Sequence, residues 1–178
     1  MLGLFTGQRQ GDRLALADND LLDGRRMFRQ SKTQAIVTIR EVPQLRARLE
    51  AAKARTAAIA LRLSQGKDGR TAEIVIDEAT GRPYNEHTYR HEFAKARAAA
   101  AVALPSLAGK RDQDLRDTAV TWLARAGATL PEIAGVTGHT TPKSIHDILK
   151  HYLAITPELA DSAIEKLMAW MESEGMAV

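Results

Sequence analysis

One short stretch, RDQDLRDTA at residues 111–119, decides how the rest of the chain is organised. On a helix, the apolar side chains in and after this stretch fall on one stripe: Leu115, Ala119, Trp122, Leu123 and Ala126. Arg116 lies about 100° round the helix from Leu115, at the edge of the stripe. Gln113 is its neighbour on the same face, because the two are three residues apart. We therefore predict a helix that holds the Arg116 guanidinium rigidly while its donors point outward.

Two more helices are expected after this one. Residues 129–132, TLPE, form a capping box, which predicts a short helix that stops at Gly138. The pair Thr141-Pro142 predicts the start of another helix, with proline at its first position. That helix ends near His151, so that Tyr152 lies at its end.

The beginning of the chain predicts a mixture of helices and strands. Residues 1–22 indicate two helices separated by a break at Thr6-Gly7, and Arg9 follows the break. Residues 24–40 alternate between apolar and polar side chains, which predicts a β-hairpin with Lys32 at its tip. Met27-Phe28 and residues 35–39, AIVTI, flank the polar residues 31–34, SKTQ.

The remaining segments are predominantly helical. Their patterning predicts helices at residues 43–63, 86–103 and 156–173, a short strand at 73–77 and a turn at 81–83. His87 and His91 have the spacing of a zinc-binding pair. However, glutamate does not follow His87 as the motif requires and no third ligand is near, so we predict no metal site.

Composition limits the classes of protein that the chain can belong to. With 178 residues, 44% apolar and 26% charged, it is long enough for one soluble globular domain. The absence of cysteine excludes disulfides, thiolate zinc sites and a cysteine nucleophile. A net charge of +3 is compatible with nucleic acid but decides little. No apolar run has the length of a membrane span and no signal peptide is visible, so we expect a cytoplasmic protein with no membrane partner.

Taken together, these segments resemble the catalytic domain of tyrosine recombinases, the phage-integrase family. The resemblance runs from about Gly3 to Tyr152 and rests on five pieces in the family's order: residues 6–12, residues 30–33, Gln113-x-x-Arg116, Gly138-His139 and Tyr152. It implies an α+β, mostly α-helical fold with a small antiparallel β-sheet. Residues 1–178 then form one catalytic domain that lacks the family's first helix and its N-terminal DNA-binding domain.

The resemblance implies that the chain cuts DNA without a metal or any other cofactor. Arg9 and Arg116 would clamp one phosphate from opposite sides, because each guanidinium fork matches two phosphate oxygens and keeps its charge. Lys32 would protonate the leaving oxygen from the flexible hairpin. His139 would donate to a phosphate oxygen or help to take the proton of Tyr152, the nucleophile. Arg9, Lys32, Arg116 and His139 would therefore also be the DNA-binding residues.

Three departures from the family pattern are visible. Gln113 stands where histidine is usual; an amide can donate to a phosphate oxygen but cannot carry a proton at neutral pH. Asp12 stands where glutamate is usual and keeps the carboxylate that supports the first arginine. The interval from His139 to Tyr152 is longer than is common. Two other tyrosines, Tyr84 and Tyr89, precede the Arg116 box and are therefore in the wrong order to be the nucleophile.

The implied function is site-specific DNA recombination or integration through a covalent 3′-phosphotyrosine. The free 5′-hydroxyl of a second strand would then attack this linkage and reseal the nick, with double-stranded DNA as the partner. One alternative is an inactive or truncated integrase remnant that acts only in DNA binding or assembly. A type IB topoisomerase shares the chemistry but not the Gly138-His139 context.

Residues 156–173 are expected to form a final amphipathic helix. Its stripe is too apolar to be left in water: Ala160, Ile164, Leu167, Met168 and Met171, with Trp170 beside it. The family resemblance implies that this segment is a subunit-exchange element, which docks on a neighbouring protomer of a DNA-bound tetramer. Packing in cis buries the same stripe. We expect a monomer in free solution and self-association on DNA.

Overall fold

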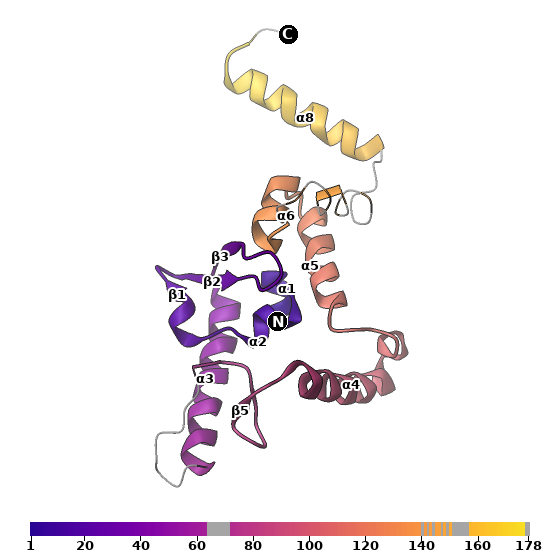
Figure 1. The fold of residues 1–178 in the computed structure, drawn as a ribbon. Coiled ribbons are helices and arrows are strands. Elements are labelled where there is room, and N and C mark those ends of the chain that lie inside the picture. Colours follow the sequence, from indigo (N-terminus) through magenta and orange to yellow (C-terminus); the bar gives the residue numbers. More distant parts are fainter. Residues whose placement is uncertain are drawn as a thin grey trace.

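The computed structural model describes residues 1–63, 72–139 and 157–176 together with residues 141, 143, 145, 146, 148 and 150; at residues 158 and 159 it describes the backbone alone. Within these ranges the fold is mostly helical, with a small antiparallel sheet near the beginning of the chain (Figure 1). The predicted fold class is therefore confirmed.

The chain begins with two short helices, α1 (Leu2–Thr6) and α2 (Gln10–Leu14). Between them Gly7 adopts φ 59°, in the left-handed region that glycine favours, and its N–H bonds to the carbonyl of Gly3. Arg9 is extended and forms the N-cap of α2. The predicted break is therefore present, and it places Arg9 at the start of a new helix.

The hairpin predicted at residues 24–40 is confirmed. Strands β2 (Arg25–Arg29) and β3 (Ile36–Arg40) pair antiparallel, and β1 (Leu21–Leu22) pairs with β2 after the short 3-10 helix η1 (Asp18–Asp20). Alternate residues of β2 are buried, as expected for a sheet with one face on the core. The turn between β2 and β3 contains Lys32.

A first core lies between the sheet and α3 (Pro43–Leu63), the long helix that follows it. It is built from aliphatic side chains and one aromatic ring: Leu16, Phe28, Val37, Leu45, Leu49 and Ile74. A buried ion pair joins the sheet to Glu41, two residues before α3, with Arg26 Nε donating to Glu41 Oε2 over 2.7 Å. Neither side chain is exposed, so removing Glu41 would leave the buried charge of Arg26 without its carboxylate partner.

After α3 the chain forms a two-stranded sheet from β4 (Ile76–Asp77) and β5 (Arg82–Pro83). The predicted strand was longer, at 73–77. The turn lies at residues 78–81 and not at 81–83 as predicted, because Arg82 and Pro83 pair back onto β4. The next helix, α4 (Glu86–Ala103), has the predicted bounds. It begins with a side-chain cap, since Asn85 accepts from the N–H of Thr88.

A second core lies where α5 (Asp114–Arg125) meets α6 (Leu130–Thr137), after the short 3-10 helix η2 (Pro105–Leu107). Its fully buried residues are Val120, Ile133 and Ile148. The predicted stripe of α5 was partly wrong: Trp122 is 55% exposed, whereas Val120 is buried. The reason is that α5 packs on α1 as well as on α6, which turns its buried face toward Ala119 and Val120 (Figure 1).

The capping box that opens α6 is confirmed. Thr129 Oγ1 accepts from the N–H of Glu132, and the Glu132 carboxylate accepts from the N–H of Thr129 at 2.6 Å. These bonds hold the pKa of Glu132 below its usual value. Gly138 ends the helix with φ 72°. The helix predicted from Thr141 to near His151 lies largely outside the described residues.

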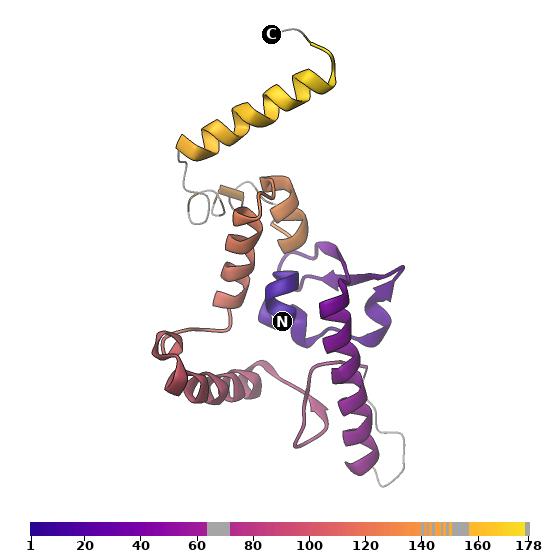
Figure 2. The same cartoon turned by 180° about the vertical axis from the view of Figure 1, so that it is seen from behind.

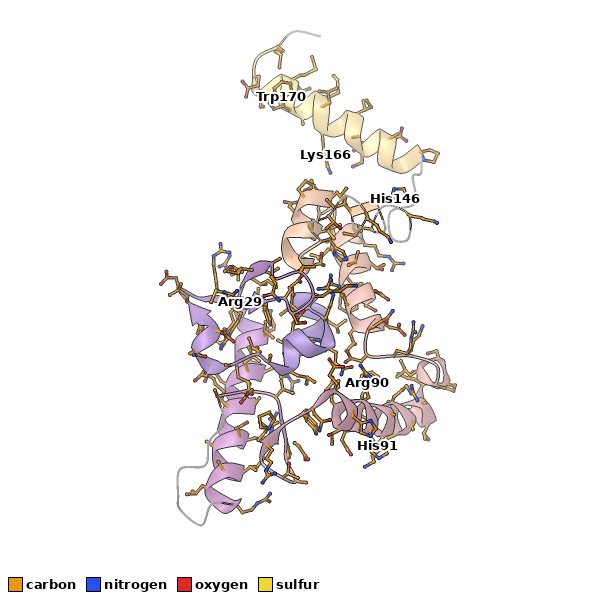
Figure 3. All side chains as sticks on the ribbon, in the orientation of Figure 1. Arg29, Arg90, His91, His146, Lys166 and Trp170 are labelled. Atoms are coloured by element: carbon orange, nitrogen blue, oxygen red, sulfur yellow. The ribbon has the colours of Figure 1, made fainter. Side chains whose placement is uncertain are left out.

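The last helix, α8 (Pro157–Ser173), lies apart from both cores in the front and back views (Figures 1 and 2). Its apolar stripe is exposed: Ile164 by 58%, Leu167 by 46% and Trp170 by 53%. Lys166 projects from α8 toward α6 (Figure 3), where its charge also lowers the pKa of Glu132. None of the described helices is long and apolar enough to cross a membrane.

Candidate active site

Arg9 is held at the N-terminus of α2 by two groups from different parts of the chain. Its Nη1 donates to the side-chain oxygen of Gln30, at the end of the β2 arm, over 3.1 Å. The same nitrogen lies 3.9 Å from Asp12 Oδ2, one turn further along α2. The Arg9 side chain is 31% exposed, so the guanidinium is oriented by the protein and still accessible to a ligand.

Arg116 extends from the first turn of α5 to the break between α1 and α2. Its Nη1 donates to the carbonyl oxygen of Gly7 over 2.6 Å. Since Gly7 is two residues before Arg9, this bond brings together the two arginines that are far apart in the sequence. A position at the edge of the buried face of α5 allows this contact.

His139 follows the left-handed Gly138 and lies against Arg116. The Arg116 Nη2 is 3.2 Å from His139 Nε2, and His139 Nδ1 is 2.6 Å from Thr137 Oγ1. Thr137 already donates its only hydroxyl hydrogen to the carbonyl of Ile133 over 2.7 Å. The hydroxyl therefore accepts from Nδ1–H. Arg116 Nη2 also lies 3.3 Å from Nδ1, so this nitrogen of the guanidinium lies over the face of the imidazole ring and not on the axis of the Nε2 lone pair.

These contacts form a closed ring. From Arg9 the ring passes to Gln30, whose Nε2 donates to the carbonyl of Thr137 over 2.8 Å, and then to His139 and Arg116. The bond from Arg116 to Gly7 closes it. Arg9, Arg116 and His139 thus lie around one small region of the surface, whereas Gln30 is a member of the ring that sequence reasoning missed.

The hairpin turn is tied to the same region through Asp12. Both the N–H and the hydroxyl of Ser31 donate to Asp12 Oδ1, over 2.8 and 2.9 Å. Asp12 is buried, and its other oxygen faces Arg9. Lys32 is the next residue and is exposed, so it is free to extend from a turn whose base is fixed.

Gln113 and Tyr152 are placed differently from the rest of the predicted set. Gln113 is the exposed N-cap of α5, and it lines a cleft between α4 and α5 together with Gln10 and Arg111. It is one turn before Arg116 and outside the ring of contacts. Tyr152 lies outside the described residues.

The two other tyrosines are half-buried in surroundings that disfavour their ionisation. Tyr89 donates to Asp112 Oδ1 over 2.9 Å, and Arg13 forms a buried ion pair with the other oxygen of Asp112. Burial, and then the charge of Asp112, raises the pKa of Tyr89 to about 12. Burial also raises the pKa of Tyr84. Each phenol is therefore a weaker nucleophile than an unperturbed tyrosine at neutral pH.

The order of these residues and the fold that carries them agree with one known family. The phage integrase family matches residues 1–158, most of the chain. The chain belongs to the phage integrase family. No curated protein matches it closely enough to be reported as a relative.

Solved integrase and recombinase structures share the fold. The integrase of transposon Tn1549 in complex with transposon right-end DNA has 21% identity and a TM-score of 0.68, over 94% of this chain and 57% of that one. The XerA recombinase has 16% identity and a TM-score of 0.60, over 93% and 55%. A lambda integrase tetramer bound to a Holliday junction has 19% identity and a TM-score of 0.59, over 83% and 40%. The chain thus spans about half the length of the structures that it matches.

Proposed function

We propose that this chain is the catalytic module of a site-specific DNA recombinase, which cuts and rejoins strands through a covalent 3′-phosphotyrosine at Tyr152. The observation that carries the proposal is the ring of contacts that gathers Arg9, Arg116 and His139 around one region. Family membership and the DNA bound to the solved Tn1549 integrase support the same assignment.

The proposed clamp of Arg9 and Arg116 suits the transition state of phosphoryl transfer. Attack at phosphorus places extra negative charge on the non-bridging oxygens, and two guanidinium groups oriented in advance stabilise that charge without reorganising. Asp12 keeps Arg9 oriented, because its buried oxygen lies within 3.9 Å of the guanidinium.

The two proton-transfer roles fall to groups on opposite sides of the clamp. Lys32, on the fixed hairpin turn, would protonate the leaving 5′-oxygen. His139 would accept the tyrosine proton at Nε2, because its Nδ1 proton is held by Thr137. Gln113 would donate an amide hydrogen to a phosphate oxygen, a role that needs no proton transfer.

Elimination supports Tyr152 as the nucleophile. The chain has three tyrosines. The pKa of Tyr89 is raised to about 12 and that of Tyr84 is raised as well, which is the wrong direction for a group that must attack as phenolate. Tyr152 is the remaining tyrosine, and it follows the Gly138-His139 pair in the order of the family.

Self-assembly on DNA is the second part of the proposal. The exposed stripe of α8 is flanked by Asp161, Glu165 and Glu172, with Lys166 as the basic residue among them. An acidic apolar helix is repelled by DNA but suits a protein surface. We propose that it docks on a neighbouring copy in a DNA-bound assembly, as the tetrameric lambda integrase on a Holliday junction suggests.

A suicide substrate tests the central step. The chain is incubated with a pool of nicked duplexes of randomised sequence, from which the short cleaved strand diffuses away so that the covalent product accumulates. The expected result is an adduct that survives denaturing electrophoresis, disappears in Tyr152→Phe and persists in the matched variant Tyr84→Phe. DNA binding without any adduct would contradict the enzyme assignment and favour a module that only binds or assembles on DNA.

A further inference from the structure

We propose that Gln30 is a positioning residue of this site, which sets the Arg9 guanidinium, the Lys32 turn and the His139 loop relative to one another. This inference rests on the proposed function, since it concerns the same phosphate clamp. Gln30 does not face the phosphate itself. It acts through the groups that do.

The first observation is that every hydrogen-bonding position of the Gln30 amide is used. Its Nε2 donates to Gln8 Oε1 over 2.7 Å and to the carbonyl of Thr137 over 2.8 Å. Its Oε1 accepts from Arg9 Nη1 over 3.1 Å and from Thr33 Oγ1 over 2.8 Å. A primary amide has two donors and two acceptor lone pairs, so nothing remains for solvent. Gln30 is fully buried, in agreement with this bookkeeping.

The second observation is that the four partners come from three separate parts of the chain. Arg9 starts α2, Thr33 follows Lys32 in the hairpin turn, and Thr137 ends α6 just before Gly138-His139. The fourth partner, Gln8, is also fully buried. Its Nε2 donates to the carbonyls of Thr6 and Val136, over 3.0 and 2.7 Å, and so joins the end of α1 to α6.

The third observation is the close approach of Gly138 to the same amide. A Cβ at this position would lie 2.6 Å from Gln30 Oε1, far inside contact distance, and it would overlap the amide nitrogen as well. The loop that carries His139 therefore packs directly on Gln30. The space that a Cβ at residue 138 would fill is occupied by the Gln30 amide, which only glycine permits. Both the bonds and the contact fix the distance between the Arg9 side and the His139 side of the site.

The chemical reason for such an arrangement is preorganisation. Arginine has a long flexible side chain, and a clamp stabilises a transition state only when its donors already point to the developing charge. A neutral amide oxygen orients the Arg9 guanidinium without neutralising it, which a carboxylate at the same distance would do. In a buried network each bond is also stronger than in water, and an unpaired member is costly.

Double-mutant cycles test this role through the salt dependence of DNA binding. The logarithm of affinity falls with the logarithm of salt by about 0.9 for each phosphate contact. We measure fluorescence anisotropy of a labelled duplex with the full chain and four variants: Gln30→Met, Arg9→Ala, the double variant, and the control Gln34→Met. Gln34 lies on the same hairpin turn and is exposed, and its side-chain amide donates to the carbonyl of Ser31 over 2.8 Å and not to the Gln30 amide. The control therefore makes the same chemical change and removes a hydrogen bond of the turn, but it leaves all four bonds of the Gln30 amide in place.

The expected result is that Gln30→Met weakens binding about tenfold and lowers the salt slope by about one, toward the Arg9→Ala value. In the Arg9→Ala background, Gln30→Met should change neither the affinity nor the salt slope. Gln34→Met should bind DNA like the unmodified chain. A merely structural role would weaken binding equally in both backgrounds and leave the slope unchanged, which would overturn the proposal. Absence of salt-dependent binding by the unmodified chain would also overturn it.

A milder variant covers the case in which Gln30→Met does not fold. Thr33→Val removes one bond to Gln30 Oε1 from an exposed hydroxyl, and Thr38→Val makes the same change on the exposed face of β3. We expect about a threefold loss of affinity for Thr33→Val that vanishes in the Arg9→Ala background, and no loss for Thr38→Val. Equal losses for the two threonines would contradict the role of Gln30. Failure of adduct formation alone would contradict the proposed function and leave this binding result valid.

Discussion

Replacing Gly138 by alanine is the most direct perturbation of the region where the His139 loop meets Gln30. Two effects combine at this position. Gly138 has φ 72°, in the region that side chains disfavour, and a Cβ there would be within 2.6 Å of Gln30 Oε1. The alanine methyl group must therefore displace either the loop or the buried amide.

The magnitude can be worked out from these two effects. Alanine at positive φ costs about 1 kcal/mol relative to glycine. Displacement of the Gln30 amide breaks its bonds to Gln8 and to the carbonyl of Thr137, and each unsatisfied buried partner costs about 1 kcal/mol or more. We expect Gly138→Ala to lower the free energy of unfolding by about 3 kcal/mol.

The chain contains a matched control for the backbone effect. Gly127 has φ 81°, and no atom lies within 4 Å of a Cβ added there. Gly127→Ala should therefore cost about 1 kcal/mol, which is the conformational penalty alone. Urea unfolding followed by circular dichroism gives both values, with an unchanged m-value as the check on two-state behaviour. Equal destabilisation by the two variants would refute the close packing of Gly138 on Gln30.

Three further predictions address the site and its surroundings. Arg116→Ala should reduce adduct formation by the equivalent of about 3 kcal/mol or more, yet destabilise the fold by only about 1 to 2 kcal/mol, since the bond to Gly7 is lost; a larger loss of stability in calorimetry would mark the residue as structural. Between pH 10 and about 12 the unfolded chain loses the Tyr89 proton that the folded chain keeps, so stability should fall with rising pH, and less steeply in Tyr89→Phe; identical slopes would rule out a raised pKa. Light scattering without DNA should report a monomer at all concentrations, and a stable oligomer that Leu167→Asp dissociates would overturn this expectation.

Much of the fold could be predicted from the sequence because local rules decide it. The capping box at Thr129 and Glu132, the helix at residues 86–103 and the hairpin at residues 24–40 each depend on neighbouring residues, and each is present in the structure. The exception on α5 is informative. A helical stripe shows which side chains are apolar, but Trp122 is exposed because α5 is covered by α1 on one side and α6 on another.

The supporting groups of the site could not be predicted in the same way. Gln8 and Gln30 are polar residues that a pattern assigns to the surface, and both are fully buried. Their burial depends on partners far along the chain, such as the bond from Gln30 to Thr137, which no periodicity reveals. The one indication about Gln30 in the sequence was its position beside Ser31-Lys32-Thr33. This position indicated that Gln30 lies near the site, but not that it orients Arg9.

The measurement that tests the central claim most directly is the mass of the peptide that carries DNA after suicide-substrate capture. Nuclease and protease digestion of the trapped complex leaves one nucleotide on one residue, which tandem mass spectrometry locates. Our account predicts a nucleotide that is joined through its 3′-phosphate to the Tyr152 phenol. This adduct should be absent in Arg9→Ala and in Arg116→Ala. A nucleotide on Tyr84 or Tyr89, or a linkage through a 5′-phosphate, would contradict it.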